Sequence, residues 1–253
     1  MFSKAIVRIP GRSMTTGLTS ATLGKPDHSL ALEQHSRYVQ TLKSLGLEVE
    51  VLPPDEQYPD STFVEDTALL TPHCAIITRP GAPSRRGEVE EMAEFIPQYY
   101  DHVERVQAPG TVEAGDIMMV GDHFYIGLSQ RTNTEGARQV IAILDRYGMT
   151  GSVIELRQVL HLKTGLAYLE NNNLLACGEF LEHPAFQHLQ VIVIPASESY
   201  AANCIWINGT VLVPAGFPVS SQRIADTGYD IIELDLSEFQ KLDGGLSCLS
   251  LRF

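Results

Sequence analysis

The sequence repeats one pattern along its length: two short apolar strands, a stretch long enough for a helix, and another strand. Four copies follow one another, and their first strands are predicted at 62–70, 115–120, 165–170 and 202–207. Their helices are predicted at 84–100, 133–147, 184–188 and 220–227. A fifth copy is split: its first strand is predicted at 246–251, and the remainder lies at the other end of the sequence, as strand 5–9, helix 28–45 and strand 49–52.

A repeat divided in this way is completed only if the two ends pair, which closes a ring of modules and leaves no free sheet edge. The repeat length, roughly 40–50 residues, is typical of radial architectures. We therefore predict an α/β fold, specifically a five-bladed α/β propeller of ββαβ modules with pseudo-fivefold symmetry, and a single domain over residues 1–253. An ordinary α+β domain with accidental regularity is the alternative.

Composition is that of a soluble globular protein, with 44% hydrophobic and 19% charged residues. No apolar stretch approaches the ~20 residues that span a bilayer, and the N-terminal segment lacks the apolar run and cleavage site of a signal peptide. We therefore predict a cytoplasmic location. The four cysteines have no CxxC spacing, so we expect free thiols rather than a zinc ribbon or a disulfide framework.

The net charge of −13 disfavours nucleic acid and anionic membranes as partners and favours cationic small molecules. An acidic surface can also serve solubility alone. A local cluster of acids would favour the first interpretation.

Such a cluster is found where the first strands begin. In a ring of modules these strand starts converge on the axis, and the residues there are polar and chemically versatile: Asp60, Glu65 and Asp66 in the first module, Glu113 and Asp116 in the second, His161 before the third, and Cys248 in the fifth. Each alone has a simpler interpretation, as a solvated face, a turn cap or a structural histidine. Together they indicate one cavity.

Cys248 follows two glycines, Gly244 and Gly245, and we expect it in a short strand. Glycines permit a close approach of another backbone or a ligand, so we expect this pair to leave room for a substrate beside the thiol. The alternative is a buried structural thiol. The remaining cysteines, Cys74, Cys177 and Cys204, lie in apolar strand sequences and are expected to be buried and inert.

A cysteine, a histidine and several carboxylates around one cavity suit nucleophilic attack on an electron-poor, cationic carbon. Carboxylates hold a guanidinium through charge-assisted hydrogen bonds, and a histidine protonates a leaving amine and then activates water. Arg85 and Arg131, each just after the second strand of its module, could bind a carboxylate at the far end of a ligand. Both could equally be surface arginines at helix starts.

The sequence resembles the dimethylarginine dimethylaminohydrolases of the guanidine-modifying (pentein) superfamily, bacterial members most closely. The similarity extends over essentially the whole chain and includes FVED at 63–66, GTVEAGD at 110–116, LHLKTG at 160–165, SYAANC at 199–204 and DGGLSC at 243–248. It implies a five-bladed α/β propeller. It also implies hydrolysis of Nω-methylated arginines to citrulline and a methylamine.

The resemblance also implies a role for each site residue. Cys248 matches the nucleophile, His161 the general acid/base and Glu113 the carboxylate that orients the histidine. Asp60, Glu65 and Asp66 match the guanidinium-binding cluster, and Arg85 and Arg131 match the residues that bind the amino-acid carboxylate. The main chains of Leu18, on a lid-like loop, and of Leu242 match contacts to the α-amino end.

No cofactor or metal is expected, although Cys248 and His161 could bind adventitious zinc. Relatives suggest a possible homodimer, and the expected partner is a methylated arginine. Two other functions remain open. One is an arginine deiminase-like activity on free arginine, against which the absence of a helical insertion argues. The other is a noncatalytic propeller acting as a binding module, against which the cysteine and histidine argue.

Overall fold

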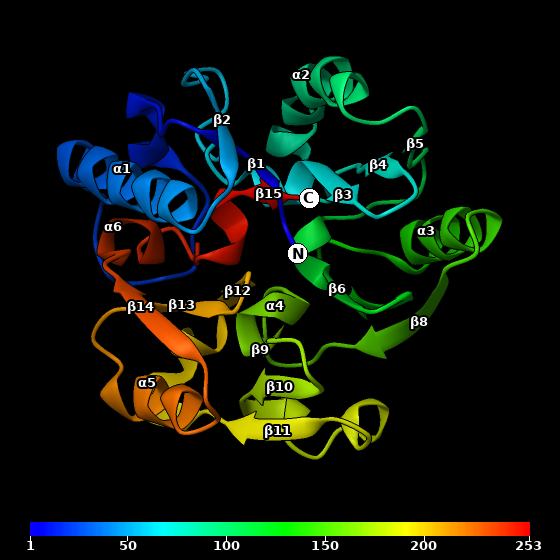
Figure 1. The fold of residues 1–253 in the computed structure, drawn as a ribbon. Coiled ribbons are helices and arrows are strands. Elements are labelled where there is room, and N and C mark those ends of the chain that lie inside the picture. The colour runs from blue at the N-terminus through cyan, green and yellow to red at the C-terminus, as the bar shows by residue number, and fades with distance from the viewer.

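The computed structural model describes residues 1–253, which form five three-stranded sheets. Figure 1 shows the sheets and their helices arranged around a common centre. In every sheet the first pair of strands is antiparallel and the second pair is parallel. The α/β fold and its repeated module are therefore as the sequence predicts.

The modules follow the predicted order along the chain. The first module contains β3 (Ala68–Leu70), β4 (Ala75–Ile77), α2 (Glu88–Phe95) and β5 (Val103–Arg105). The second contains β6 (Ile117–Val120), β7 (His123–Leu128), α3 (Thr134–Arg146) and β8 (Thr150–Glu155). The third contains β9 (Leu166–Tyr168), β10 (Asn173–Ala176) and β11 (Gln190–Val193), with a 3-10 turn at Pro184–Phe186 in place of a helix. The fourth contains β12 (Ile205–Ile207), β13 (Thr210–Pro214), α5 (Pro218–Ala225) and β14 (Asp230–Leu234).

The fifth module is assembled from both ends of the chain. It contains β15 (Leu251–Arg252), β1 (Lys4–Arg8), α1 (His28–Ser44) and β2 (Glu48–Leu52), and its sheet order is β15-β1-β2. Strand β15 pairs antiparallel with β1, with Ala5 opposite Arg252. Figure 1 shows both chain ends near the centre of the molecule. The predicted pairing of the two ends is thus confirmed.

Local signals explain where several elements begin and end. The side chain of Asp27 accepts the backbone N–H of Leu30 at the start of α1, and Asn133 caps α3 through the N–H of Gly136. The β12–β13 hairpin turns at Asn208 and Gly209, both with positive φ, as an Asn-Gly turn requires.

The hydrophobic core is divided among the interfaces between modules. There are five clusters of buried apolar residues, and each combines side chains from two neighbouring modules. The cluster between the fifth and fourth modules, for example, joins Val7 and Tyr38 to Ile207 and Leu212. Each sheet is therefore covered by its neighbours, which explains why its strands are apolar on both faces.

The starts of the predicted first strands are wrong in a consistent way. In each module the residues before the strand form a helical turn instead, and at 62–70 only Ala68–Leu70 is strand, preceded by the 3-10 turn Val64–Thr67. A short apolar run carries no periodicity that separates strand from turn. A strand would send successive side chains to opposite faces, whereas a turn brings consecutive polar groups toward the centre.

The remaining elements of the structure include two short helices, α4 (Leu162–Gly165) and α6 (Ser237–Gln240). None of its helices has the length and apolar character needed to cross a membrane.

Candidate active site

Five helical turns surround the centre of the molecule, one at the start of each first strand. In order of contact they are the 3-10 turns Ser247–Leu249, Val64–Thr67 and Ala114–Asp116, then α4, then the 3-10 turn Ala196–Ala202. Asn203, which follows the last turn, hydrogen-bonds to Ser247 in the first. The convergence of strand starts predicted from the sequence is therefore present, with turns in place of strand ends.

One pocket collects nine of the ten residues to which the family resemblance gives a role. Those that line it are Leu18, Asp60, Asp66, Arg85, Glu113, Arg131, His161, Leu242 and Cys248. The tenth, Glu65, does not line this pocket. It lines an adjoining cavity that it shares with His161 and Cys248.

Cys248 does not lie in a strand, contrary to the sequence prediction; it lies in the 3-10 turn Ser247–Leu249, before β15. The backbone N–H of Gly245 points at its sulfur, with 3.4 Å between N and Sγ. Burial, together with the charges of Glu65 and Asp66, raises the pKa of the Cys248 thiol to about 12. The thiol is therefore neutral near pH 7 in the free protein.

The glycine pair before this turn borders the cavities that contain Cys248, because Gly244 lines the pocket and Gly245 lines the adjoining cavity. That the pair leaves room for a substrate stays a prediction. A Cβ on Gly244 would lie 2.2 Å from the ring of Phe63, and one on Gly245 would lie 2.5 Å from the side chain of Asn203. The glycines also let the backbone of the cysteine turn pack directly on its neighbours.

His161 caps α4 and pairs with Glu113, with 2.9 Å between Nε2 and Oε2. Burial alone would lower the pKa of His161, but Asp66, Glu113 and Asp116 outweigh burial and raise it to about 9. Burial would raise the pKa of Glu113, yet its contact with His161 lowers it. The pair therefore holds an imidazolium beside a carboxylate at neutral pH, which is the state needed to donate a proton.

Arg85 is buried among acids. Its Nη1 lies 2.6 Å from Asp66 and its Nη2 lies 2.8 Å from Glu88, and it also donates to the carbonyl oxygen of Phe63. The adjacent guanidinium lowers the pKa of Asp66 to about 2 against the effect of burial. Arg85 thus reaches the pocket with most of its donors already engaged.

The guanidinium of Arg131 has fewer partners in the protein than that of Arg85. Its Nη1 has one contact with the protein, at 3.4 Å from Glu113 Oε1, and its side chain is 20% exposed. Its backbone packs closely on the first module, because a Cβ on Gly81 would lie 2.3 Å from the carbonyl oxygen of Arg131.

Asp60 and the loop of Leu18 form one wall of the pocket. The carboxylate of Asp60 accepts the backbone N–H of Leu18 at 3.0 Å, and Asp243 accepts the N–H of Ser20 further along the same loop. Burial raises the pKa of Asp60. Hydrogen bonds to two carboxylates therefore hold this exposed loop over the pocket.

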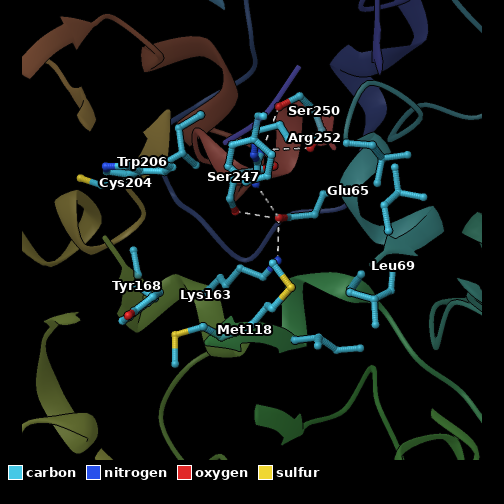
Figure 2. A pocket seen from close by; sticks show the side chains of 18 of the residues that line it. Glu65, Leu69, Met118, Lys163, Tyr168, Cys204, Trp206, Ser247, Ser250 and Arg252 are labelled. Atoms are coloured by element: carbon cyan, nitrogen blue, oxygen red, sulfur yellow. Dashed lines mark hydrogen bonds and ion pairs between the residues drawn. The ribbon is translucent and has the colours of Figure 1, made fainter. Parts of the chain in front are cut away.

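Glu65 belongs to a partition between two cavities. Its carboxylate binds Lys163 at 2.7 Å and accepts the hydroxyl of Ser247 at 2.7 Å, with Arg252 at 3.5 Å. Figure 2 shows this ionic group within a cavity walled by Leu69, Met118, Tyr168 and Trp206. That cavity, about 160 Å³, is larger than the thiol pocket but contains neither Cys248 nor His161.

Sequence reasoning missed two residues that hold the cysteine and histidine turns. Asn203 accepts the N–H of Ser247 and donates to the carbonyl oxygen of Lys163, so one amide spans both turns. Ser247 links the cysteine turn to Glu65. The only sequence signal for Asn203 is its position in the SYAANC segment.

Three ligand atoms with metal-site spacing occur in the pocket, because those of Asp66, Glu113 and His161 lie within 4.8 Å of one another. They already have partners in the protein: Arg85 and Gly115 bind Asp66, and His161 binds Glu113. The donor set therefore belongs to a hydrogen-bonded ionic network in which Arg85 and His161 supply the positive charges.

Comparison with known proteins places this geometry in a family. The family model described as N,N dimethylarginine dimethylhydrolase, eukaryotic, matches residues 23–194. The N(G),N(G)-dimethylarginine dimethylaminohydrolase of Pseudomonas aeruginosa is 61% identical over 254 residues, covering 100% of each chain. This chain belongs to the dimethylarginine dimethylaminohydrolase family.

Solved structures of the family superpose closely on this chain. A mutant of the P. aeruginosa dimethylarginine dimethylaminohydrolase complexed with citrulline has a TM-score of 0.99 at 61% identity, covering 100% of both chains. An adduct of a dimethylarginine dimethylaminohydrolase with S-methyl-L-thiocitrulline has the same TM-score, identity and coverage. The family resemblance read from the sequence is therefore confirmed.

Proposed function

We propose that this protein hydrolyses Nω-methylated arginines, asymmetric dimethylarginine and monomethylarginine, to citrulline and a methylamine. The observation that carries the proposal is one pocket that contains a thiol, a histidine–carboxylate pair and further buried acids. Family membership at 61% identity supports the same activity. The ligands in the related structures, citrulline and a thiocitrulline, are a product and a substrate-like adduct of this chemistry.

Substrate binding follows from the charges around the pocket. Asp60 and Asp66 face the position of the guanidinium, and Glu113 contacts it beside His161. Arg131 binds the amino-acid carboxylate. Arg85 forms ion pairs with Asp66 and Glu88 and lines the same pocket as Arg131. The main-chain groups of Leu18 and Leu242 bind the α-amino end. Glu65 does not contact the substrate directly. It lines the adjoining cavity and holds the cysteine turn through its hydrogen bond with Ser247.

The reaction has two steps. The cationic substrate stabilises the Cys248 thiolate, so the thiol proton is released to solvent water. The thiolate sulfur then bonds to the guanidinium carbon, the C=N π electrons move onto nitrogen, and a neutral tetrahedral centre results. The C–N bond to the methylated nitrogen then breaks, His161 donates a proton to the departing amine, and a thiouronium remains on sulfur.

Water completes the cycle. His161, now neutral, removes a proton from a water molecule as that water attacks the thiouronium carbon. The C–S bond breaks as the carbonyl of citrulline forms, and the proton of the added hydroxyl passes to the departing sulfur, which restores the thiol and releases citrulline. The ionised acids lower the energy of each cationic species on this path.

The direct test measures citrulline and amine release from asymmetric dimethylarginine. The wild-type protein should release both in equal amounts, and Cys248→Ser should abolish turnover because the hydroxyl is a far weaker nucleophile. The matched control is Cys177→Ser, which makes the same sulfur-to-oxygen change outside the pocket and should retain activity. Full turnover by Cys248→Ser would overturn the covalent mechanism. Faster ammonia release from free arginine would instead favour a deiminase.

We also propose that the five modules close into a five-bladed α/β propeller and act as a single catalytic domain. Support comes from the completion of the fifth sheet by β15 and from the five core clusters between neighbouring modules. A cytoplasmic location, a possible homodimer, and the lack of nucleic-acid or membrane partners remain part of this proposal. Neither cofactor nor metal has a step in the mechanism.

A further inference from the structure

Asp116 is a buried acid to which the proposed mechanism assigns no contact with substrate. Its side chain is 0% exposed, and it ends the 3-10 turn that begins beside Glu113. A carboxylate removed from water in this way is costly unless each oxygen accepts hydrogen bonds. The hydrogen-bond partners of Asp116 therefore indicate its role in the protein.

The two oxygens of Asp116 reach two different loops. Oδ1 accepts the backbone N–H of Leu162, the residue after His161, at 3.0 Å. Oδ2 accepts the hydroxyl of Ser129 at 2.6 Å. One carboxylate thus connects the histidine turn of the third module to the loop after β7 in the second.

Ser129 extends this connection to Arg131. Its Oγ accepts the backbone N–H of Arg131 at 2.9 Å and that of Thr132 at 3.1 Å. Because the hydroxyl accepts two N–H groups, its own proton is available for Asp116 alone. The direction of every bond in this chain is fixed, and only an acceptor fits at the Asp116 end.

Asp116 also interacts with His161 electrostatically. The acids that raise the pKa of the imidazole are Asp66, Glu113 and Asp116. The other charged and titratable groups that line the same cavities are Asp60, Glu65, Arg85, Arg131, Lys163 and Cys248. Burial raises the pKa of Asp116 itself to about 6, while its hydrogen bonds favour the ionised form. Above that pH, Asp116 adds a negative charge behind the histidine.

We propose that Asp116 is a positioning residue that ties the His161 turn to the Arg131 loop, so that one buried carboxylate places both the proton donor and the cation that binds the substrate carboxylate. This inference rests on the proposed function. It predicts that loss of Asp116 weakens both binding of the substrate's amino-acid end and proton transfer at its guanidinium end.

The test compares Asp116→Asn with Ser129→Ala and with Asp122→Asn, an exposed aspartate on the β6–β7 turn. The asparagine keeps the acceptor for Leu162 but cannot accept the Ser129 proton, and it removes the charge. We expect kcat to fall on the order of 10-fold and KM to rise several-fold. The fall of activity at high pH, expected near the pKa of His161 at about 9, should move down by on the order of one pH unit.

Ser129→Ala separates the two roles, because it breaks the connection to Arg131 and leaves the charge. Its KM should rise while its fall of activity near pH 9 stays that of wild type, because Asp116 remains ionised at that pH. Asp122→Asn should change neither. Titration of the His161 imidazole by NMR in the wild type and in Asp116→Asn gives a readout that does not need turnover. A wild-type protein inactive on methylated arginine would overturn the proposed function, whereas an unchanged His161 titration in an active protein would overturn the role of Asp116 alone, so the two failures are distinguishable.

Two results would overturn the inference. One is an unchanged His161 titration in Asp116→Asn. The other is a KM for Ser129→Ala that equals the Asp122→Asn value, which decides the question even if Asp116→Asn does not fold.

Discussion

Arg85 and Arg131 occupy similar places in neighbouring modules, just after the second strand, but their surroundings differ. The Arg85 side chain is 6% exposed and paired with Asp66 and Glu88, whereas Arg131 is 20% exposed with a single 3.4 Å contact to Glu113. The sequence assigns both to the same task, binding a ligand carboxylate. The comparison indicates that Arg85 chiefly neutralises the acids of the pocket and that Arg131 has the free donors for a ligand.

The largest effect is expected from Arg85→Met. This change leaves Asp66 and Glu88 as buried acids without their cation, which should cost about 3–5 kcal/mol of unfolding free energy and abolish activity. Urea denaturation measures the loss. Arg138→Met removes an exposed ion pair with Glu135 and should cost less than about 1 kcal/mol. Equal stabilities of the two variants would contradict a structural role for Arg85.

Arg131→Met should affect binding and leave stability within about 0.5 kcal/mol of wild type. Loss of charge-assisted hydrogen bonds, worth about 1.5–3 kcal/mol, should raise KM for asymmetric dimethylarginine roughly 10- to 100-fold. Nω,Nω-dimethylagmatine, which lacks the carboxylate, sharpens the comparison. If Arg131 binds the carboxylate, wild type and variant should turn over this analogue equally; a similar loss with both substrates would count against that role.

The smallest effect is expected from Glu88→Gln and depends on pH. Burial raises the pKa of Glu88 from 4.5 to about 7, despite the adjacent Arg85. A raised carboxyl pKa means that the folded protein binds the proton more tightly, so this stabilisation is present below pH 4.5 and is lost as pH rises to 7. Wild type should therefore lose about 1 kcal/mol per pH unit relative to Glu88→Gln between pH 5 and 7. Parallel stability curves over that range would show that Glu88 stays ionised.

The sequence was sufficient for the modules and for most of the pocket. The split repeat predicts the pairing of β15 with β1, and the recurrence of polar residues at strand starts predicts that Cys248, His161 and Glu113 converge. Both depend on the order of elements along the chain, which is visible in a sequence.

Side-chain partners and local backbone geometry were not predictable in the same way. The partner of Arg85 could have been a ligand or Glu88, and only the fold shows that Glu88 reaches it from the first turn of α2. Likewise, the glycines before Cys248 are compatible with either an open approach or tight packing. The structure shows tight packing against the ring of Phe63 and the amide of Asn203, which come from distant segments, while both glycines also line the cavities at Cys248.

The fifth sheet has a consequence for the order of folding. Ser3 donates its backbone N–H to Phe253, a contact across 250 residues of chain. Contacts so distant in sequence close the longest loops, and proteins dominated by such contacts fold slowly. We expect the four contiguous modules to form before this sheet, so that the acids and His161 are in place first. Because Cys248 lies three residues before β15, we expect the thiol to join the site only when the fifth sheet is completed, so partly folded molecules hold no assembled nucleophile.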